Sequence, residues 1–482
     1  MRSLIMQASG DLGNGMYRNP ILAGDYADPS VVRVGDDYYM THSNFKFAPG
    51  LLIWHSKDLV NWEPIAKALT DYAGDVWAPD LTYYKDRFYI YAPINEEIMV
   101  LTATHPHGPW SDPQKVGVQG IDPGHVADSN GNRYLFFSDG YMVELAGDGL
   151  SAVGTPRKVY DGWPFPKEWV VEGNFMESPK LTFHNGYFYL TVAQGGTSGP
   201  STSHMVASAR SKEPWGPYEH SPHNPIIRTQ SRNERWCSKG HGSLVDTPDG
   251  GWWIVYHAYE KGYYTLGRQT LLEPLEWTED GWFRVPLHCK TDEPIPKPPG
   301  DAVPHGMTYG EFQEVSGGLG YPWSWYQSSN DIQYTLQKQA ITIQAAPEAS
   351  PLVMMPEDHS YAAQVEIELS EESAAQFLLF YNGSTYSGFG ISQEGLYGII
   401  RGWETPSKPF PHRRVIVRLE NNEHEVVFYY SADGSLWNKF EHSFETSGWH
   451  HNTLGGFLAL RIALRAKGSG EVTFKNFIYQ KL

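Results

Sequence analysis

Three carboxylates and one histidine occupy matching places in a repeated stretch of the sequence. Each precedes a short β-type run, a turn and a second run rich in aromatic residues, about eight or nine positions ahead of the turn. They are Asp28, Asp122, Glu177 and His241, with Ala78 at the same place in one further repeat. Carboxylates that converge can divide acid–base work, because neighbouring charges separate their pKa values. Cleavage of a glycosidic bond needs such a division: a protonated acid at the leaving oxygen, and an ionised carboxylate for the water or the sugar carbon.

The repeat itself predicts the fold that would bring these side chains together. Its five copies start roughly 45 to 65 residues apart, near the blade periods of β-propellers. Turn signals such as Asn185-Gly186 between two β-type runs are typical of hairpins. The innermost strand of each blade runs along the central axis, so we expect the five register positions to form a ring at one end of a five-bladed propeller.

A change of pattern near residue 285 indicates a second domain. Residues 291–300 are rich in proline and should form a stiff, extended connector. Short alternating runs follow, which are typical of a β-sandwich; they cover residues 340–343, 363–367, 376–381, 414–419, 425–430 and 471–477. The sequence therefore predicts an all-β protein, with a five-bladed β-propeller in residues 1–300 and a C-terminal β-sandwich in residues 301–482.

The composition narrows the class of partner. The chain has 482 residues, 14% of them aromatic, and a net charge of −18. Such a field repels nucleic acid and anionic membranes, so neither is expected as a partner, whereas a neutral glycan meets no opposition. The two cysteines exclude a disulfide framework. The first residues lack the apolar run of a secretion signal, which predicts a cytoplasmic location.

The repeated motifs resemble those of glycoside hydrolase family 43, the five-bladed propeller enzymes that include β-xylosidases and α-L-arabinofuranosidases. The resemblance covers residues from about 17 to 290 in the family's order, and residues from about 305 to 482 resemble a sandwich found on one branch of the family. The matching segments are Tyr26-Ala27-Asp28-Pro29-Ser30, Val76-Trp77-Ala78-Pro79-Asp80, Gly120-Ile121-Asp122-Pro123, Glu177-Ser178-Pro179-Lys180-Leu181, Gly240-His241-Gly242-Ser243-Leu244-Val245 and Leu266-Gly267-Arg268-Gln269-Thr270.

The resemblance implies a role for each matched side chain. Asp28 would be the general base that activates water, and Glu177 the general acid. Asp122 would raise the pKa of the acid and hold it in position. Arg268 would bind substrate hydroxyl groups, and His241 would lie near a structural calcium ion, with no cofactor required for catalysis. The family inverts the anomeric centre, so Asp28 and Glu177 should stand roughly 6.5–9.5 Å apart to admit a water molecule.

Other side chains near these motifs have competing interpretations. Trp77 is either blade core or a platform for a sugar ring, and its place beside a ring position favours the platform. Phe45 follows an inner hairpin and is expected to wall the pocket. Glu172 competes with Glu177 as the acid, because Glu172-Gly173 resembles the pair usual in the family, but its distance to the following turn does not fit. Asp25 is interpreted as a loop carboxylate.

Together these features predict an inverting exo-glycosidase that hydrolyses terminal β-D-xylosyl or α-L-arabinofuranosyl residues from xylo- or arabino-oligosaccharides. The alternatives are an endo-acting hydrolase of the arabinanase type and a glycan-binding propeller without turnover. The sandwich is expected to have a structural role on the propeller rather than to act as a carbohydrate-binding module. Because appended sandwiches often join subunits, a homo-oligomer is a further expectation.

Overall fold

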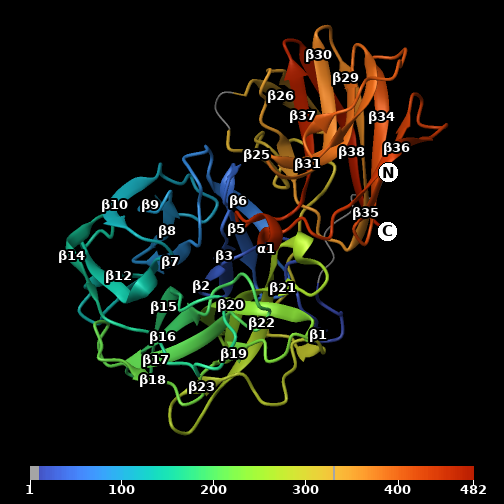
Figure 1. Cartoon of the computed structure of the whole chain (residues 1–482). Coiled ribbons are helices and arrows are strands. Elements are labelled where there is room, and N and C mark those ends of the chain that lie inside the picture. Colours follow the sequence, from blue (N-terminus) through green and yellow to red (C-terminus); the bar gives the residue numbers. More distant parts are fainter. Residues whose placement is uncertain (1–9, 329–331) are drawn as a thin grey trace.

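Five antiparallel β-sheets surround one axis in the first part of the chain. The computed structural model describes residues 10–328 and 332–482, and Figure 1 shows these sheets as the blades of a propeller. In chain order, the first two blades consist of β2 (Ser30–Val34), β3 (Asp37–Thr41), β5 (Gly50–Ser56) and β6 (Glu63–Leu69), then β7 (Asp80–Tyr84), β8 (Arg87–Ile94), β9 (Glu97–Ala103) and β10 (Gln114–Gln119). The third and fourth consist of β11 (Gly124–Ala127), β12 (Arg133–Phe137), β13 (Tyr141–Leu145) and β14 (Ala152–Lys158), then β15 (Met176–His184), β16 (Tyr187–Gln194), β17 (Met205–Ser211), β18 (Glu219–His220) and the added β19 (Ile227–Arg228). The fifth consists of β20 (Trp236–Asp246), β21 (Trp252–Glu260), β22 (Arg268–Trp277) and β23 (Phe283–Arg284).

The local sequence explains these blades. Asn185 and Gly186, with φ of 46° and 78°, form the turn between β15 and β16, because a tight hairpin of this type needs two residues in the left-handed region. The second strand of a blade is buried on both faces, so β16 and β21 are almost continuously apolar or aromatic and not alternating. The five-bladed propeller predicted from the repeat is confirmed.

The second part of the chain forms two stacked antiparallel sheets. Aromatic contacts between the sheets, such as Phe377 on Phe428 at 6.0 Å between ring centroids, fill the space between them. One sheet contains β25 (Trp323–Tyr326), β28 (Leu352–Met354), β30 (Ser373–Asn382), β31 (Thr385–Ser392), β32 (Gly395–Ile400), β33 (Trp403–Glu404) and β37 (Arg461–Gly468). The other contains β26 (Tyr334–Gln337), β27 (Ala340–Gln344), β29 (Ser360–Leu369), β34 (Arg414–Asn422), β35 (Glu425–Ser431), β36 (Asn438–Glu445) and β38 (Glu471–Lys481). The predicted sandwich is therefore present.

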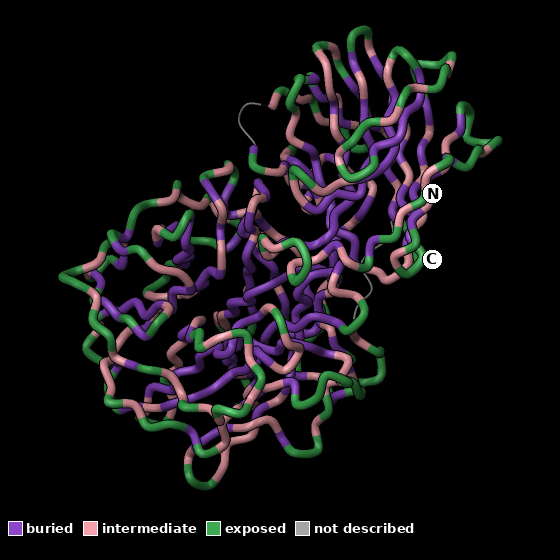
Figure 2. The backbone as a smooth tube through the Cα atoms, viewed as in Figure 1, coloured by how far each residue is buried: buried purple, intermediate pink, exposed green. Residues whose placement is uncertain are grey.

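The two parts are joined by more than the connector. Strand β4 (Phe47–Ala48) leaves the first blade and pairs with β25 at the edge of the sandwich. Strand β1 (Met16–Tyr17) pairs with β24 (Ile295–Pro296), so the start and the end of the propeller segment meet. Figure 2 shows that the buried backbone continues from the propeller into the sandwich, and one apolar cluster contains side chains of both parts.

Helical structure is scarce in residues 10–328 and 332–482. Two short 3-10 turns occur, η1 (Ser138–Gly140) and η2 (Tyr264–Leu266), with one α-helix, α1 (His451–Leu454). None of the helices in these ranges is long and apolar enough to cross a membrane. In Figure 1, α1 lies where the sandwich meets the centre of the propeller.

Candidate active site

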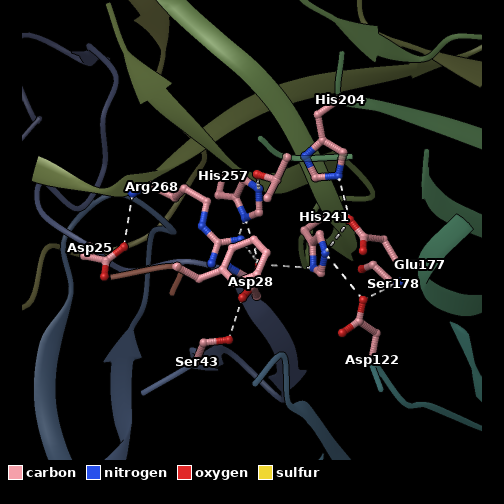
Figure 3. A network of polar contacts seen from close by, with 12 residues as sticks. Asp25, Asp28, Ser43, Asp122, Glu177, Ser178, His204, His241, His257 and Arg268 are labelled. Atoms are coloured by element: carbon pink, nitrogen blue, oxygen red, sulfur yellow. Dashed lines mark hydrogen bonds and ion pairs between the residues drawn. The ribbon is translucent and has the colours of Figure 1, made fainter. Parts of the chain in front are cut away.

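The inner strands bring the predicted ring together. Asp28 and Asp122 precede β2 and β11, while Glu177 and His241 lie within β15 and β20. The ring of His241 contacts all three carboxylates, as Figure 3 shows. Its Nδ1 is 3.3 Å from Asp28 Oδ1, and its Nε2 is 3.5 Å from Asp122 Oδ2 and 3.6 Å from Glu177 Oε1. The imidazole of His241 thus lies between Asp28 on one side and the Asp122–Glu177 pair on the other.

The backbone is strained at or next to each of the four side chains around the propeller axis. Asp28, Asp122, Ser178 and His241 have φ values of 59°, 54°, 53° and 54°, in the region that side chains disfavour. The pairing register of β15 shifts between Glu177 and Lys180, and that of β20 shifts near His241. Such bulges bend a strand and re-aim its side chains, here towards the axis.

Asp28 is held as an anion by the groups around it. Ser43 Oγ donates a hydrogen bond of 2.5 Å to Asp28 Oδ2, and Arg268 Nη1 donates to Oδ1 at 3.0 Å. Burial opposes ionisation, but the charges of Arg268 and His241 outweigh it, so the pKa of Asp28 lies well below its usual value. The Asp28 N–H donates to His257 Nδ1 at 3.0 Å, so this nitrogen is an acceptor and burial keeps His257 neutral, with a strongly lowered pKa.

Asp122 and Glu177, on the other side of His241, have pKa values shifted in opposite directions. Burial, together with the charges of Glu177 and Asp28, raises the pKa of Asp122 to about 7, although the positive charge of His241 opposes the rise. Burial also opposes ionisation of Glu177, but contacts to His204 and His241 outweigh it and lower the pKa of Glu177. His204 Nε2 is 3.3 Å from Glu177 Oε1. Burial would lower the pKa of His241, but the three carboxylates raise it to about 9, so its ring is a cation at neutral pH.

The sequence-based expectation that Asp122 raises the pKa of Glu177 stays a prediction, because the same mutual repulsion that raises the pKa of Asp122 acts on Glu177, whose contacts to His204 and His241 lower its pKa. Contacts to His204 and His241 favour the anion of Glu177, and burial together with the nearby carboxylates favours the protonated form of Asp122. The Ser178 N–H also donates to Asp122 Oδ2 at 3.1 Å, which fixes Asp122 beside the strand that carries Glu177. Near pH 7 the pair can hold one proton between its two carboxyl groups, and acid catalysis needs such a proton to donate.

Arg268 is buried beside the base. Its backbone N–H donates to Asp25 Oδ1 at 3.1 Å, and its guanidinium lies 5.4 Å from the ring centroid of Phe45. Gly267 makes the Asp25 contact possible: a Cβ at this glycine would come within 2.3 Å of the carboxylate. Asp25 lies in a loop, as its sequence position suggested, and it is also a buried partner of the site. Phe45 lies against Arg268, and its role as a pocket wall stays a prediction.

The sandwich contributes a wall to the same site. Phe457, which follows α1, has its ring 5.5 Å from the Arg268 guanidinium and 6.5 Å from the Trp77 ring. His451 stacks on Phe457 at 3.9 Å and accepts a hydrogen bond from its N–H at 2.8 Å. The other imidazole nitrogen contacts Ser198 of the propeller. A loop of the sandwich is thus docked over one side of the site.

A cavity of about 570 Å³ opens on the side of Glu177. Trp77 is half-buried and lines this cavity together with Glu177, and its role as a sugar platform stays a prediction. Glu172, the competing acid, is exposed, and its Oε2 accepts a hydrogen bond of 2.8 Å from the Ser198 N–H. It does not line the cavity. Glu177 is the residue that the fold brings to the ring.

Residues 17–283 match the sequence family described as Glycosyl hydrolases family 43. The chain belongs to that family. A Vibrio protein named xylan 1,3-beta-xylosidase is 33% identical over 311 residues, or 55% of this chain and 56% of that protein. A Bacteroides ovatus protein named non-reducing end alpha-L-arabinofuranosidase BoGH43B is 35% identical over 305 residues, or 58% of this chain and 55% of that protein. The chain thus matches little more than half the length of these curated relatives.

Solved structures of family 43 proteins resemble the whole chain. A mutant of the GH43 protein BlXynB from Bacillus licheniformis has a TM-score of 0.87 and 27% identity, covering 97% of this chain and all of that one. The Bacteroides ovatus protein titled Xyloglucan PUL GH43B has a TM-score of 0.85 and 25% identity over 97% of this chain. The resemblance therefore includes the sandwich as well as the propeller.

Several groups of this family 43 site were missed by sequence reasoning. His204 and His257 lie outside the repeated register position, and their only signal is that each belongs to a blade whose inner strand carries a site residue. Asp25 has no pattern of its own, and Phe457 lies far along the chain in the other domain. These groups reach the site through tertiary packing.

The side chains around His241 supply few oxygen ligands for the calcium ion that the family resemblance implied. Two groups of side chains lie within ligand reach of one another, Asp28 with His241 and His257, and Glu177 with His204 and His241. Each group has two imidazoles and one carboxylate, whereas calcium takes six to eight oxygen ligands. The protonated ring of His241 already supplies a positive charge among the carboxylates. These residues do not fit calcium.

Proposed function

We propose that this chain is an inverting exo-glycosidase that removes terminal β-D-xylosyl residues, with terminal α-L-arabinofuranosyl residues as the second substrate class. The observation that carries the proposal is the placing of an ionised Asp28 across the ring of His241 from a carboxyl pair that holds one proton. The names of the curated relatives support the two pentoses.

In the proposed reaction, Glu177 donates its proton to the glycosidic oxygen as the bond from that oxygen to the anomeric carbon breaks. Asp28 accepts a proton from a water molecule, whose oxygen forms the new bond at the opposite face of the anomeric carbon. Substrate that excludes water from the pocket favours the neutral form of Glu177, so the proton shared with Asp122 passes to the acid. Arg268 donates hydrogen bonds that hold Asp28 and, beside it, the terminal sugar.

The sandwich loop supports action at chain ends. Phe457 and α1 cover the side of the site beside Arg268, where a continuing glycan chain would have to pass in an endo-acting enzyme. Trp77 and the cavity beside Glu177 leave the opposite side open for the leaving group. An endo-acting enzyme would release internal fragments from long arabinan or xylan, which this arrangement opposes.

The test compares the wild type with Glu177→Gln and Asp28→Asn on a 4-nitrophenyl pentoside and on the corresponding disaccharide. Removal of the acid should lower kcat/KM on the disaccharide by at least ~10²-fold and less on the nitrophenyl substrate, whose leaving group needs little protonation. Removal of the base should lower both rates alike. Glu172→Gln is the matched control and should keep most activity. NMR of the first product anomer should show inversion. Retained disaccharide turnover in Glu177→Gln, or retention of configuration, would contradict the proposal.

A further inference from the structure

The cavity beside Glu177 has aromatic walls and an acidic rim. Tyr141 and Phe175 line it and remain 39% and 50% exposed, so their rings are accessible to a molecule in the cavity. Phe137 stacks under Tyr141 at 6.1 Å and 15° between the rings. A volume of about 570 Å³ lies within the usual range of small-molecule sites, roughly 300–1,000 Å³. Flat apolar faces of this kind suit the C–H faces of sugar rings.

The position of the cavity beside Glu177 indicates which part of the substrate it would hold. Glu177 lines it, whereas Asp28 does not. The acid protonates the oxygen that joins the terminal sugar to the rest of the glycan, so the leaving group lies on the acid's side of that oxygen. The cavity is thus positioned to hold the leaving group, an assignment that rests on the function proposed above.

The charged side chains that line the cavity are all acidic: Glu96, Asp139 and Glu177. Within the part of the chain that the structure describes, the carboxylates of Glu96 and Asp139 form no ion pair or hydrogen bond. Lys158 lies opposite Tyr141 in the β13–β14 ladder and interacts electrostatically with Asp139, but it does not line the cavity and its Nζ is 3.0 Å from Asp161 Oδ1. The chain as a whole adds a charge of −18.

The two rim acids are carried by rigid turns. Glu96 lies in the tight turn between β8 and β9, with φ of 66°, and its carbonyl oxygen accepts a hydrogen bond of 2.8 Å from the Gly120 N–H. Asp139 lies in η1 with φ of 62°. The Ser138 N–H donates to the Ile121 carbonyl oxygen at 3.1 Å, and the Val159 N–H donates to that of Gly140 at 2.8 Å, so the backbone that carries Asp139 is also held at the cavity.

We propose that this cavity is a leaving-group site for uncharged sugars, and that Glu96 and Asp139 exclude leaving groups that carry a carboxylate, such as glycans with a uronic acid next to the terminal pentose. A carboxylate that entered would meet acidic side chains and find no lining cation to pair with. Because the rim acids are exposed, their repulsion is screened by salt, with a Debye length of about 10 Å at 0.1 M.

The experiment uses two aryl glycosides of whichever pentose the wild type hydrolyses, with 4-carboxyphenyl and 4-(methoxycarbonyl)phenyl leaving groups. These differ by one negative charge and by the methyl group of the ester. The ratio of their kcat/KM values is measured in the wild type and in the Glu96→Gln/Asp139→Asn variant at low and high salt. Intrinsic leaving-group reactivity cancels when the two ratios are compared. Glu279→Gln/Glu348→Gln, two exposed acids distant in sequence from the cavity turns, makes the same change in net charge and serves as the matched control.

We expect the carboxylate-to-ester ratio to rise by ~3–10-fold in the cavity variant at low salt, and this gain to shrink at high salt. The control variant should keep the wild-type ratio. An unchanged ratio in the cavity variant, or an equal rise in the control, would overturn the inference and leave the proposed function standing. A wild type that hydrolyses neither pentose would overturn both. A glucuronate-bearing xylo-oligosaccharide should then show the same selectivity as the aryl probe.

Discussion

Arg461 Nη2, in strand β37 of the sandwich, lies 3.6 Å from Asp25 Oδ2 of the propeller. Both side chains are almost completely buried, so each is the charge that compensates the other. Asp25 in turn accepts the backbone N–H of Arg268, the residue that holds the base. The sandwich is therefore connected to the catalytic ring by a buried ion pair as well as by the loop that carries Phe457.

Loss of this ion pair should destabilise the protein. Arg461→Met leaves Asp25 buried without its partner, which typically costs about 3–5 kcal/mol of the free energy of unfolding. We expect the midpoint of thermal unfolding to fall and kcat/KM to fall with it, since an uncompensated Asp25 anion disturbs the packing around the Arg268 N–H that it accepts. Arg414→Met is the matched control, because Arg414 pairs with Glu366 at an exposed site and should contribute at most about 1 kcal/mol. Asp25→Asn/Arg461→Met should recover part of the stability; a double variant no more stable than Arg461→Met would contradict this account.

Activity should fall as the pH rises through about 7. The pKa of Asp122 is raised from 3.8 to about 7, so the shared proton is bound below that value and lost above it. Without it Glu177 cannot be protonated, whereas Asp28 is ionised throughout because its pKa is strongly lowered. The profile of kcat/KM against pH, which reports the free enzyme, should show this basic limb. Asp122→Asn should remove the limb and lower the maximum; a variant that keeps the limb at the same pH would assign it to another group.

The same proton affects stability with a definite sign. A carboxyl group whose pKa is raised on folding binds its proton more tightly in the folded protein, so it favours folding most at low pH. This contribution of Asp122 should be lost between pH 3.8 and about 7. His241 adds a loss in the same direction from pH 6.5 to about 9, because its raised pKa favours the protonated folded state below 6.5. Thermal unfolding of Asp122→Asn should vary less with pH than the wild type over the lower window, and an equal slope would contradict the assignment.

Removal of the sandwich wall should weaken binding of the terminal sugar. Phe457→Ala deletes the ring that faces Arg268 and Trp77 and should lower kcat/KM by ~10-fold through the lost apolar contact. Phe457→Leu should lose less, because part of the apolar surface remains. Leu454→Ala, at an exposed position of α1, tests whether any change in this loop has the same effect. Equal kinetics of Phe457→Ala and the wild type would exclude Phe457 from the pocket.

Gly240 should be intolerant of a methyl group. A Cβ there would lie 2.3 Å from the ring of His204, which contacts Glu177. Gly240→Ala should displace His204, lower activity and cost about 1–3 kcal/mol of the free energy of unfolding. Gly147→Ala is the matched control, because a Cβ there meets nothing within 4 Å. If Gly240→Ala has the same activity and stability as Gly147→Ala, the position of His204 is not required for either.

Local sequence patterns determined a large part of this protein. Alternation and turn chemistry predict the hairpin around Asn185-Gly186 and sandwich strands such as β35. The same signals predict the shared register position of Asp28, Asp122, Glu177 and His241. These signals depend on residues a few positions apart, and a propeller repeats one such unit around an axis. The register alone was enough to predict that the four side chains meet.

Only the tertiary structure decided which other groups join them. His257 reaches Asp28, and His204 reaches Glu177, because blades closed into a ring bring strands together that no local pattern relates. The transfer of β4 to the sandwich, the ion pair of Asp25 with Arg461, and the place of Phe457 depend on how two domains pack. The protonation of Asp122 and Glu177 also depends on the tertiary structure, because a pKa depends on burial and on every charge nearby, whatever their separation along the chain.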